Sequence, residues 1–243
     1  MGFIGFLYPW GILLQVLAVI HFFRRRPETF WIYVIFFLGP PGALIYIVME
    51  VVPDLGLLRQ SFDSFGRRKR IRLLEALIVQ NPSAGNYEEL GDLYLEEKKF
   101  AKARECYDKA ISPRTAHLDP IYRRAIAEIQ LGDFAAAATD LEQVTSRDAK
   151  YDSHRAVGLL AHAFANTGRA EEAEALFRQA TERSTLTETQ VNYATFLASQ
   201  NRPQEARQWA EAVLERKPTM PRYLQRRERP WFRKAKAVLK RVK

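Results

Sequence analysis

The chain has 243 residues, of which 47% are hydrophobic and 27% charged, and its formal net charge is +9 at pH 7. This composition is compatible with a folded protein of one or two domains, and the single cysteine, Cys106, excludes an intramolecular disulfide and a CxxC metal site. The charge is unevenly distributed, because residues 59–72 and 219–243 are strongly basic whereas residues 73–218 carry a net charge of −5.

Two apolar segments open the chain. Residues 3–23 are apolar apart from Gln15 and His21, and these 21 residues suffice to cross a bilayer. A secretory signal peptide is the alternative, but the arginines follow the segment instead of preceding it and no small-residue cleavage site is present. Residues 30–52 form the second segment, in which the sequence GPPG at 39–42 bends or breaks a helix. We therefore expect a two-helix membrane hairpin over residues 1–53.

The hairpin has the arginine-rich connection RRRPET, then Trp31, and a Pro-Gly pair followed by Tyr46. In these features it is similar to the N-terminal membrane hairpin found ahead of phospholipase D-type cardiolipin synthases. That family uses an H-x-K-x(4)-D motif whose histidine attacks phosphorus. None of the four histidines here is followed by lysine two residues later, so the resemblance implies at most a shared anchor.

Residues 54–83 are expected to form a basic juxtamembrane linker followed by an N-terminal capping helix. The linker contains the basic run Arg67, Arg68, Lys69 and Arg70. Near a membrane such a run attracts anionic lipid by about 1 kcal/mol per basic residue, and a solvated helix face is the alternative interpretation. The segment IRLLEALIVQ at 71–80 has the pattern of the capping helix.

From residue 84 to residue 220, small residues recur at nearly constant spacing. Separations of 34, 36 and 33 residues connect Ala103, Ala137, Ala173 and Ala206. A period near 34 indicates a repeated helical hairpin, which gives four repeats at 84–117, 118–151, 154–187 and 187–220. A second series marks the closest crossing of the two helices in each repeat, where only a small side chain fits: Gly91, Ala125, Ala161 and Ala194.

This pattern resembles the tetratricopeptide repeat (TPR) family over residues 84–220. The turn residues agree, because Gly132, Gly168 and Asn201 tolerate the positive φ found at helix C-termini. Arg124 and Glu128 depart from it, since the family places apolar residues there. The resemblance implies an all-α, right-handed solenoid whose concave face holds a peptide or protein and performs no chemistry.

After the fourth repeat, residues 221–243 are basic and contain an amphipathic stretch at 231–242. We expect a C-terminal capping helix, because a repeat array ends in a helix with a polar outer side. Contact with a membrane surface is an additional role for it. Its aromatic residues interleave with arginines as in nucleic-acid platforms, but a membrane-tethered chain disfavours nucleic acid as the partner.

Catalytic and metal-binding patterns are missing from the sequence. His154 and His162 lack zinc spacing, and neither GxxxxGK nor GxGxxG occurs. The sequence therefore predicts no enzyme, no metal site and no cofactor.

The family's geometry implies which side chains line the concave groove. We predict a partner-binding set of Glu88, Asp92, Glu96, Tyr122, Ile126, Ile129, His162, Asn166 and Asn192. Its acidic entrance beside an apolar patch favours a partner segment with basic and aliphatic side chains. In the alternative interpretation, the first helix of repeat 2 is rotated so that Tyr122 and Ile126 are buried.

Together these features predict an adaptor or scaffold that is anchored in the cytoplasmic membrane of a bacterium and binds a protein partner. The basic residues of the connection 24–29 and of the stretch 59–72 give conflicting orientations, and a re-entrant second segment would satisfy both. A kinked full crossing avoids the burial against protein that a re-entrant turn needs, so we expect two crossings. The larger second cluster favours the cytoplasmic side for the repeats. The alternative function is an accessory subunit or enzyme of membrane phospholipid metabolism.

Overall fold

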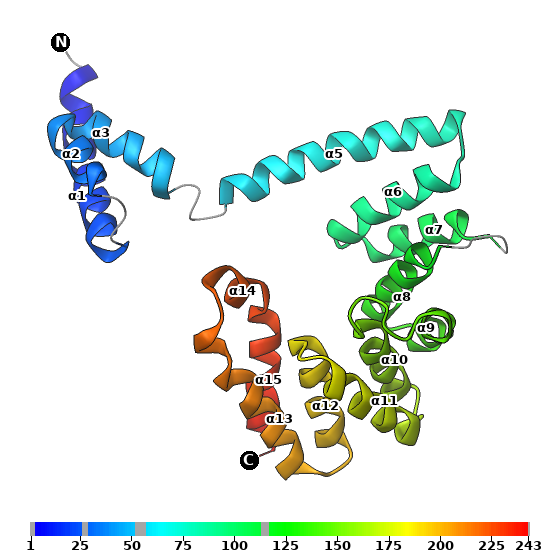
Figure 1. Ribbon diagram of the computed structural model, residues 1–243. Coiled ribbons are helices and arrows are strands. Elements are labelled where there is room, and N and C mark those ends of the chain that lie inside the picture. The colour runs from blue at the N-terminus through cyan, green and yellow to red at the C-terminus, as the bar shows by residue number, and fades with distance from the viewer. Residues whose placement is uncertain (1–2, 26–28, 52–56, 113–116, 243) are drawn as a thin grey trace. The chain divides into compact units, whose positions relative to one another are not determined.

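The computed structural model describes residues 3–25, 29–51, 57–112 and 117–242 (Figure 1). Within these ranges every regular element is a helix, as the sequence predicts. The chain divides into two compact units, Met1–Arg72 and Leu73–Lys243.

In the first unit, α1 (Phe3–Arg25) packs against α2 (Phe30–Phe37) and α3 (Gly39–Tyr46), and a π-helix (Ile47–Val51) follows. The break between α2 and α3 lies at Gly39, whose φ is +61°. Pro40 and Pro41 then occupy the first turn of α3, where a missing N–H removes no helical hydrogen bond. The predicted break at the GPPG sequence is therefore confirmed.

The first unit places polar pairs inside and large apolar side chains outside. Gln15 Nε2 donates to the Ile35 carbonyl oxygen at 3.1 Å, and His21 Nδ1 lies 2.9 Å from the hydroxyl of Tyr46, which is fully buried. By contrast, Phe36 and Phe37 are 77% and 83% exposed. The exposed apolar surface also includes Ile12, Leu13, Val16, Leu17, Ile20, Phe23, Phe30, Leu44, Ile45, Val48 and Met49.

None of the helices in the described ranges combines the length and the apolar character that a membrane span requires. The two membrane crossings therefore stay a prediction. The predicted connection at 24–29 and the predicted boundary after residue 53 fall partly on residues 26–28 and 52–56, which lie outside the described residues.

The predicted linker and capping helix form one helix, α5 (Leu57–Gln80). Arg68, Lys69 and Arg70 are exposed on it, and Arg67 is half-buried. Near its C-terminal end the Glu75 carboxylate accepts a hydrogen bond from the Tyr94 hydroxyl of α6 at 2.5 Å. This hydrogen bond connects α5 to the first repeat, and the capping role of the helix stays a prediction.

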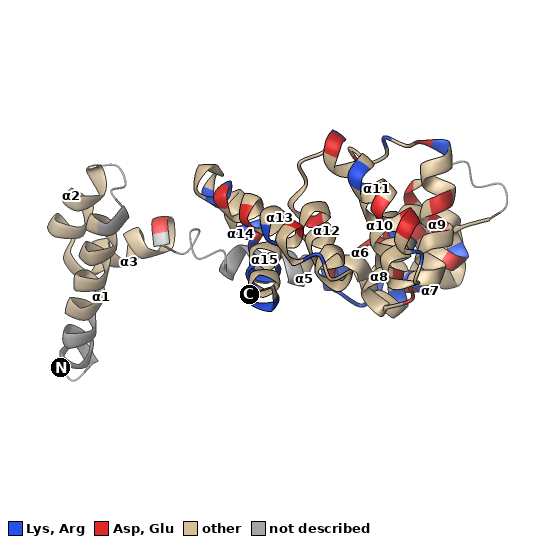
Figure 2. Ribbon diagram, turned by 90° about the horizontal axis from the view of Figure 1, so that it is seen from below, with Lys and Arg blue, Asp and Glu red and all other residues tan. Residues whose placement is uncertain are grey.

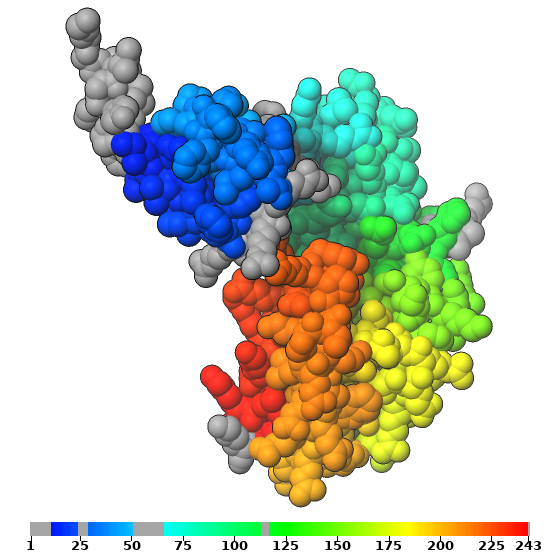
Figure 3. All heavy atoms as spheres, turned by 60° about the vertical axis from the view of Figure 1, so that its left-hand side comes forward, coloured from blue at the N-terminus to red at the C-terminus, as the bar shows by residue number. Residues whose placement is uncertain are grey.

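Four helix pairs follow one another along a curved path in the second unit (Figure 1). Their bounds are α6 (Ala84–Glu96) and α7 (Phe100–Ala110), α8 (Asp119–Leu131) and α9 (Phe134–Arg147), α10 (Arg155–Asn166) and α11 (Ala170–Arg183), and α12 (Thr187–Ser199) and α13 (Pro203–Glu215). A 3-10 turn (Lys217–Thr219) and a short helix, α14 (Arg222–Arg227), lead to α15 (Arg229–Arg241). Figure 3 shows α15 alongside α13, and α15 also packs on α12.

The two series of small residues lie at the helix contacts. Every alanine in both series is 0% exposed. Gly91 shows how close the approach is, because a Cβ atom added there would lie 2.8 Å from Cε1 of Tyr107 on α7. The predicted crossing positions are therefore confirmed as sites that exclude bulk.

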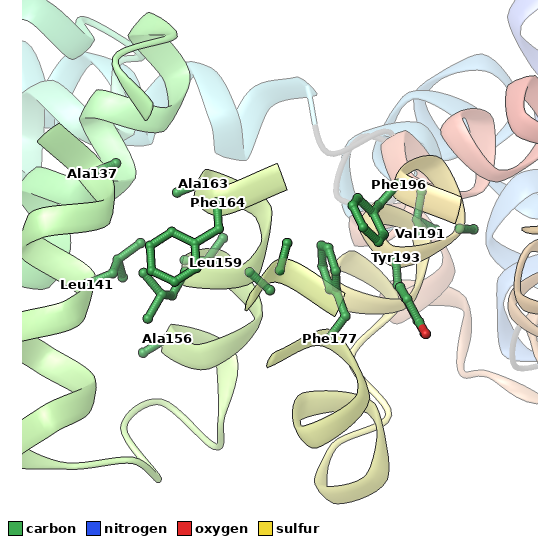
Figure 4. Close-up of a cluster of buried hydrophobic side chains, with 14 of the residues drawn as sticks. Ala137, Leu141, Ala156, Leu159, Ala163, Phe164, Phe177, Val191, Tyr193 and Phe196 are labelled. Carbon is green, nitrogen blue, oxygen red and sulfur yellow. The ribbon is translucent and has the colours of Figure 1, made fainter. Parts of the chain in front are cut away.

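Aromatic side chains connect successive pairs. Phe177 of α11 is fully buried and its ring stacks on Tyr193 of α12, with centroids 5.2 Å apart. Figure 4 shows Phe177 between the side chains of α10 and those of Tyr193 and Phe196. One hydrophobic core consequently runs from α8 to α15.

The predicted turn residues adopt the predicted conformation. Gly132, Gly168 and Asn201 have φ values of +81°, +82° and +57°. In the first repeat Lys98 takes the equivalent place with φ of +59°, a conformation that is costly for a residue with a Cβ atom.

The two polar departures of repeat 2 form a buried ionic cluster. Arg124 donates to both carboxylate oxygens of Asp140 at 2.7 and 2.8 Å and to Asp108 at 2.8 Å. Glu128 is only 5% exposed, its Oε2 has no hydrogen-bond partner, and its nearest approach to Arg124 is 4.0 Å. Burial, and next the charge of Asp140, raise the pKa of Glu128 to about 7.

Glu128→Gln should stabilise the protein above neutral pH. A carboxyl group whose pKa is raised in the folded state destabilises that state as pH rises from its unfolded value, near 4.5, through about 7. We expect the variant to gain on the order of 1 to 3 kcal/mol in free energy of unfolding at pH 8 and to lose this part of the pH dependence. Urea unfolding followed by circular dichroism at several pH values measures both. The exposed Glu211→Gln serves as the control, and equal pH slopes in the wild type and Glu128→Gln would contradict the assignment.

Candidate partner-binding groove

Three hollows lie along one side of the repeats. Their lining residues come from the first helix of each pair, from α15 and from the loop between α9 and α10. We call this surface the groove and name its parts the N-terminal, central and C-terminal hollows, with volumes of about 620, 60 and 320 Å³.

The N-terminal hollow is lined by two tyrosines, two arginines and two aspartates among apolar side chains: Leu95, Asp119, Tyr122, Arg123, Ile126, Tyr151, Asp152 and Arg155. Its two arginines already have carboxylate partners. Arg123 lies 3.1 Å from Asp92, and Arg155 lies 2.7 Å from Glu188. The charges of this hollow are thus largely compensated within the protein.

The loop before α10 is held against α8 by two phenols. The Tyr122 hydroxyl donates to Asp152 at 2.6 Å, the Tyr151 hydroxyl donates to Asp119 at 2.5 Å, and the two rings meet edge to face at 4.9 Å. Burial is the largest of the effects that raise the pKa of Tyr122, so its hydroxyl stays a neutral donor.

The same loop has unusual backbone geometry. Asp152, Ser153 and His154 have φ values of +46°, +54° and +66°, and each such residue costs roughly 1 kcal/mol or more. The hydrogen bonds from the two tyrosines offset this strain and fix one wall of the N-terminal hollow.

The central hollow brings together four of the predicted groove residues, Ile126, Ile129, His162 and Asn192. Trp231 and Lys234 of α15 complete its wall. Burial, and secondarily the charge of Lys234, lower the pKa of His162 to about 4, so the imidazole is neutral at pH 7. Asn166 donates to the His162 backbone oxygen at 2.8 Å.

The C-terminal hollow lies between α10, α12 and α15. Its lining residues are His162, Asn192, Thr195, Ala198, Lys234, Ala237, Val238 and Arg241. The sequence indicated the apolar face of α15 but did not assign any of its residues to the groove. The sequence does contain a signal for this second face. Residues at i, i+3, i+7 and i+10 lie on one side of a helix, and this spacing connects Trp231, Lys234, Val238 and Arg241.

Several predicted groove residues lie elsewhere than expected. Glu88, Asp92, Glu96 and Asn166 do not line the three hollows. Asp92 accepts a hydrogen bond from the Tyr107 hydroxyl at 2.7 Å and pairs with Arg123, so the expected acidic entrance is partly neutralised.

Two of the predicted groove residues are more deeply buried than an open groove requires. Tyr122 and Asn192 are 6% and 5% exposed, so neither is the open concave side chain that we expected. For Tyr122 the structure agrees with the alternative in which repeat 2 buries this ring, whereas Ile126 stays half-buried. Tyr122 is buried because it packs on Tyr151 and in the main hydrophobic core.

In the part of the chain that the structure describes, no cluster of three or more His, Cys, Asp or Glu side chains could hold a metal ion. The groove therefore offers shape, apolar surface and hydrogen-bonding groups, which are the means by which a peptide segment is recognised.

Comparison with known families agrees with the repeat pattern. Residues 84–112 and 122–185 match two family models, each described as "Tetratricopeptide repeat". The chain thus carries TPR repeats in these stretches. A comparison with curated protein sequences gives no match.

Solved structures share the fold at low sequence identity. YrrB, described as "a TPR protein with an unusual peptide-binding site", is 16% identical with a TM-score of 0.55, over 68% of this chain and 84% of YrrB. MamA residues 41 to the end from Desulfovibrio magneticus RS-1 are 17% identical with a TM-score of 0.57, over 70% and 93%. At these identities the likeness shows the fold alone. The two family models cover repeat residues only, so the resemblance of residues 1–53 to cardiolipin synthases stays a prediction.

Tyr122 should behave as a structural residue. Tyr122→Ala removes a buried ring and is expected to cost about 3 to 5 kcal/mol. Tyr122→Phe keeps the ring and removes the hydroxyl, which donates to Asp152 and accepts from Arg155, at about 1 to 2 kcal/mol. Urea unfolding followed by the loss of helical circular dichroism gives both values. If Tyr122→Ala left the unfolding midpoint unchanged, the ring would not be holding the loop.

Proposed function

We propose that this chain, which carries tetratricopeptide repeats, is a membrane-anchored adaptor that holds a segment of a protein partner in the groove. TPR proteins serve as protein-interaction scaffolds, and the groove is the feature that supports this role here. The observation that carries this proposal is that neighbouring hollows share lining residues. The half-buried Ile126 lines both the N-terminal and the central hollow, and the polar His162, Asn192 and Lys234 line both the central and the C-terminal hollow. Such alternation suits an extended or helical segment.

The printed description of YrrB adds limited support. It assigns a peptide-binding site to a protein of the same fold. For this chain the argument rests on its own residues, because a shared fold does not carry a shared ligand.

Membrane anchoring is supported by the reversed polarity of the first unit. Gln15 and His21 find hydrogen-bond partners inside, while the outer surface presents large apolar side chains such as Phe36 and Phe37. Exposed apolar surface costs about 25 cal/mol per Å² in water, and a patch this extensive marks an interaction surface. A lipid environment removes that cost and also favours internal pairing of polar groups.

We further propose the cytoplasmic membrane of a bacterium, with the repeats on the cytoplasmic side. The basic run Arg67, Arg68, Lys69 and Arg70 supports this orientation, because positively charged flanks stay on that side. The same run is proposed to contact anionic lipid.

An accessory role in phospholipid metabolism is the competing function. It depends on the similarity of residues 1–53 to a membrane hairpin found ahead of certain synthases. Turnover of phosphatidylglycerol by the purified chain, without any partner, would favour it over the adaptor.

Affinity capture from a detergent extract tests the adaptor function. Ile126→Ala with Ile129→Ala should reduce partner recovery at least about tenfold while helical circular dichroism is retained, because both side chains line the central hollow and are only half-buried. Leu131→Ala is the matched control, since Leu131 lies on the same helix, is 42% exposed and does not line the hollows. Equal recovery with the double variant and the control would count against the groove.

Orientation in the membrane can be tested by thiol labelling. Cys106 is a poor reporter, because it is 7% exposed and burial raises its pKa to about 11, which keeps the thiol protonated. We therefore place the reporter at an exposed position of α9, as Ser146→Cys in a Cys106→Ala background. In spheroplasts, an impermeant maleimide should label it only after the membrane is opened. Labelling of intact spheroplasts would put the repeats outside.

A further inference from the structure

Two cations of α15 border the C-terminal hollow without a carboxylate partner. Within the described residues, Lys234 and Arg241 form no ion pair, and Lys234 lies only over the Trp231 ring, at 4.4 Å from its centroid. The arginines elsewhere in the groove differ, because Arg123 and Arg155 are both paired. The uncompensated positive charge is therefore concentrated at one end of the groove, and Figure 2 shows the basic residues gathered on α15.

A buried carboxamide lies in the same hollow. Asn192 of α12 is 5% exposed and lines both the central and the C-terminal hollow. Its side chain forms no hydrogen bond with another described residue, and it is not among the fully enclosed polar groups that lack a partner. Its amide is thus available to donate to a ligand that enters the hollow.

The remaining lining residues limit the ligand further. Ala198, Ala237 and Val238 give the hollow an apolar floor, and the Thr195 hydroxyl already donates to the Val191 oxygen at 2.7 Å. His162 is neutral at pH 7 and adds no charge to the hollow. The ligand that suits these surroundings is an anionic group next to an aliphatic side chain.

We propose that the C-terminal hollow binds an acidic-aliphatic stretch of the partner segment, with its carboxylates on Lys234 and Arg241, the Asn192 amide donating to one of them, and the aliphatic side chain on Val238. This inference rests on the proposed adaptor function and names the partner's chemistry at that end of the groove. It differs from the basic partner expected from the sequence, because Arg123 partly neutralises the acidic entrance and α15 supplies positive charge at the other end.

The spacing of the two cations is compatible with two carboxylates of one extended peptide. Lys234 and Arg241 are seven residues apart, or about 10 Å along the helix, and their long side chains can converge from that separation. Alternate residues of an extended peptide lie about 7 Å apart on one face. An Asp-Leu-Asp-Leu sequence therefore presents two carboxylates to the rim and a leucine to the floor.

The test uses the full chain in zwitterionic detergent micelles with the probe acetyl-Asp-Leu-Asp-Leu-amide. Binding is followed by NMR through the imidazole of His162 and the side-chain amide of Asn192. We expect saturable shifts at both groups and at least about tenfold weaker binding of acetyl-Asn-Leu-Asn-Leu-amide, which lacks the charge. Equal affinity for the two peptides, or no saturable shift with the acidic one, would overturn the proposal.

A matched pair of variants separates the site from general electrostatic attraction. Lys234→Gln with Arg241→Gln should weaken the acidic probe at least about tenfold, whereas Lys236→Gln with Lys240→Gln should change it less than about twofold. Both pairs remove the same charge from the same helix, but only the first lines the hollow. Similar losses in both pairs would show non-specific attraction. Dihexanoyl phosphatidylglycerol is then added as a competitor of the acidic peptide. If the lipid displaces the bound peptide at a lower concentration than the peptide itself needs for binding, the hollow is a lipid site and the proposal fails.

Partner capture and probe binding together distinguish the acidic-peptide site from the adaptor function. Capture that depends on Ile126 and Ile129 but survives the loss of Lys234 and Arg241 would refute the acidic site and leave the adaptor intact. Saturable binding of the acidic probe without capture of any partner would support the hollow and refute the adaptor.

Discussion

Close approach of two helices at small residues is the constraint on which the repeat architecture depends. Each pair meets where no side chain larger than a methyl group fits, and at Gly91 even a methyl group would collide with Tyr107. This contact sets the distance within a pair, after which Phe177 and Tyr193 can stack between pairs. The first helices are thereby arranged in a row, and that row forms the groove.

The groove has different electrostatic character at its two ends. In the N-terminal hollow the arginines are neutralised by nearby carboxylates, and two tyrosines close the wall. In the C-terminal hollow the basic residues belong to α15, which covers the end of the core with one face and lines the hollow with another. The helix that completes the solenoid therefore also decides the charge that a partner meets.

Polar side chains are partly buried in the first unit and fully buried in the second, with different consequences. In the first unit, Gln15 and His21 form hydrogen bonds within the helices of residues 3–51, and the exposed large side chains of these helices are apolar. In repeat 2, Arg124 is held by two aspartates, while Glu128 keeps an oxygen without a partner. The first arrangement is the basis of the proposed membrane anchor, and the second makes stability depend on pH.

The sequence by itself determined the helical class, the repeat period, the turn residues and the small-residue contacts, because these follow from local spacing that every repeat satisfies in the same way. It did not determine which concave side chains are open. The burial of Tyr122 and the neutralisation of Asp92 come from partners, Tyr151 and Arg123, that lie about 30 residues away in the chain. The place of Lys234 was decided by how α15 packs on α12 and α13. Contacts between residues distant in sequence have no fixed spacing, so only the tertiary structure could specify them.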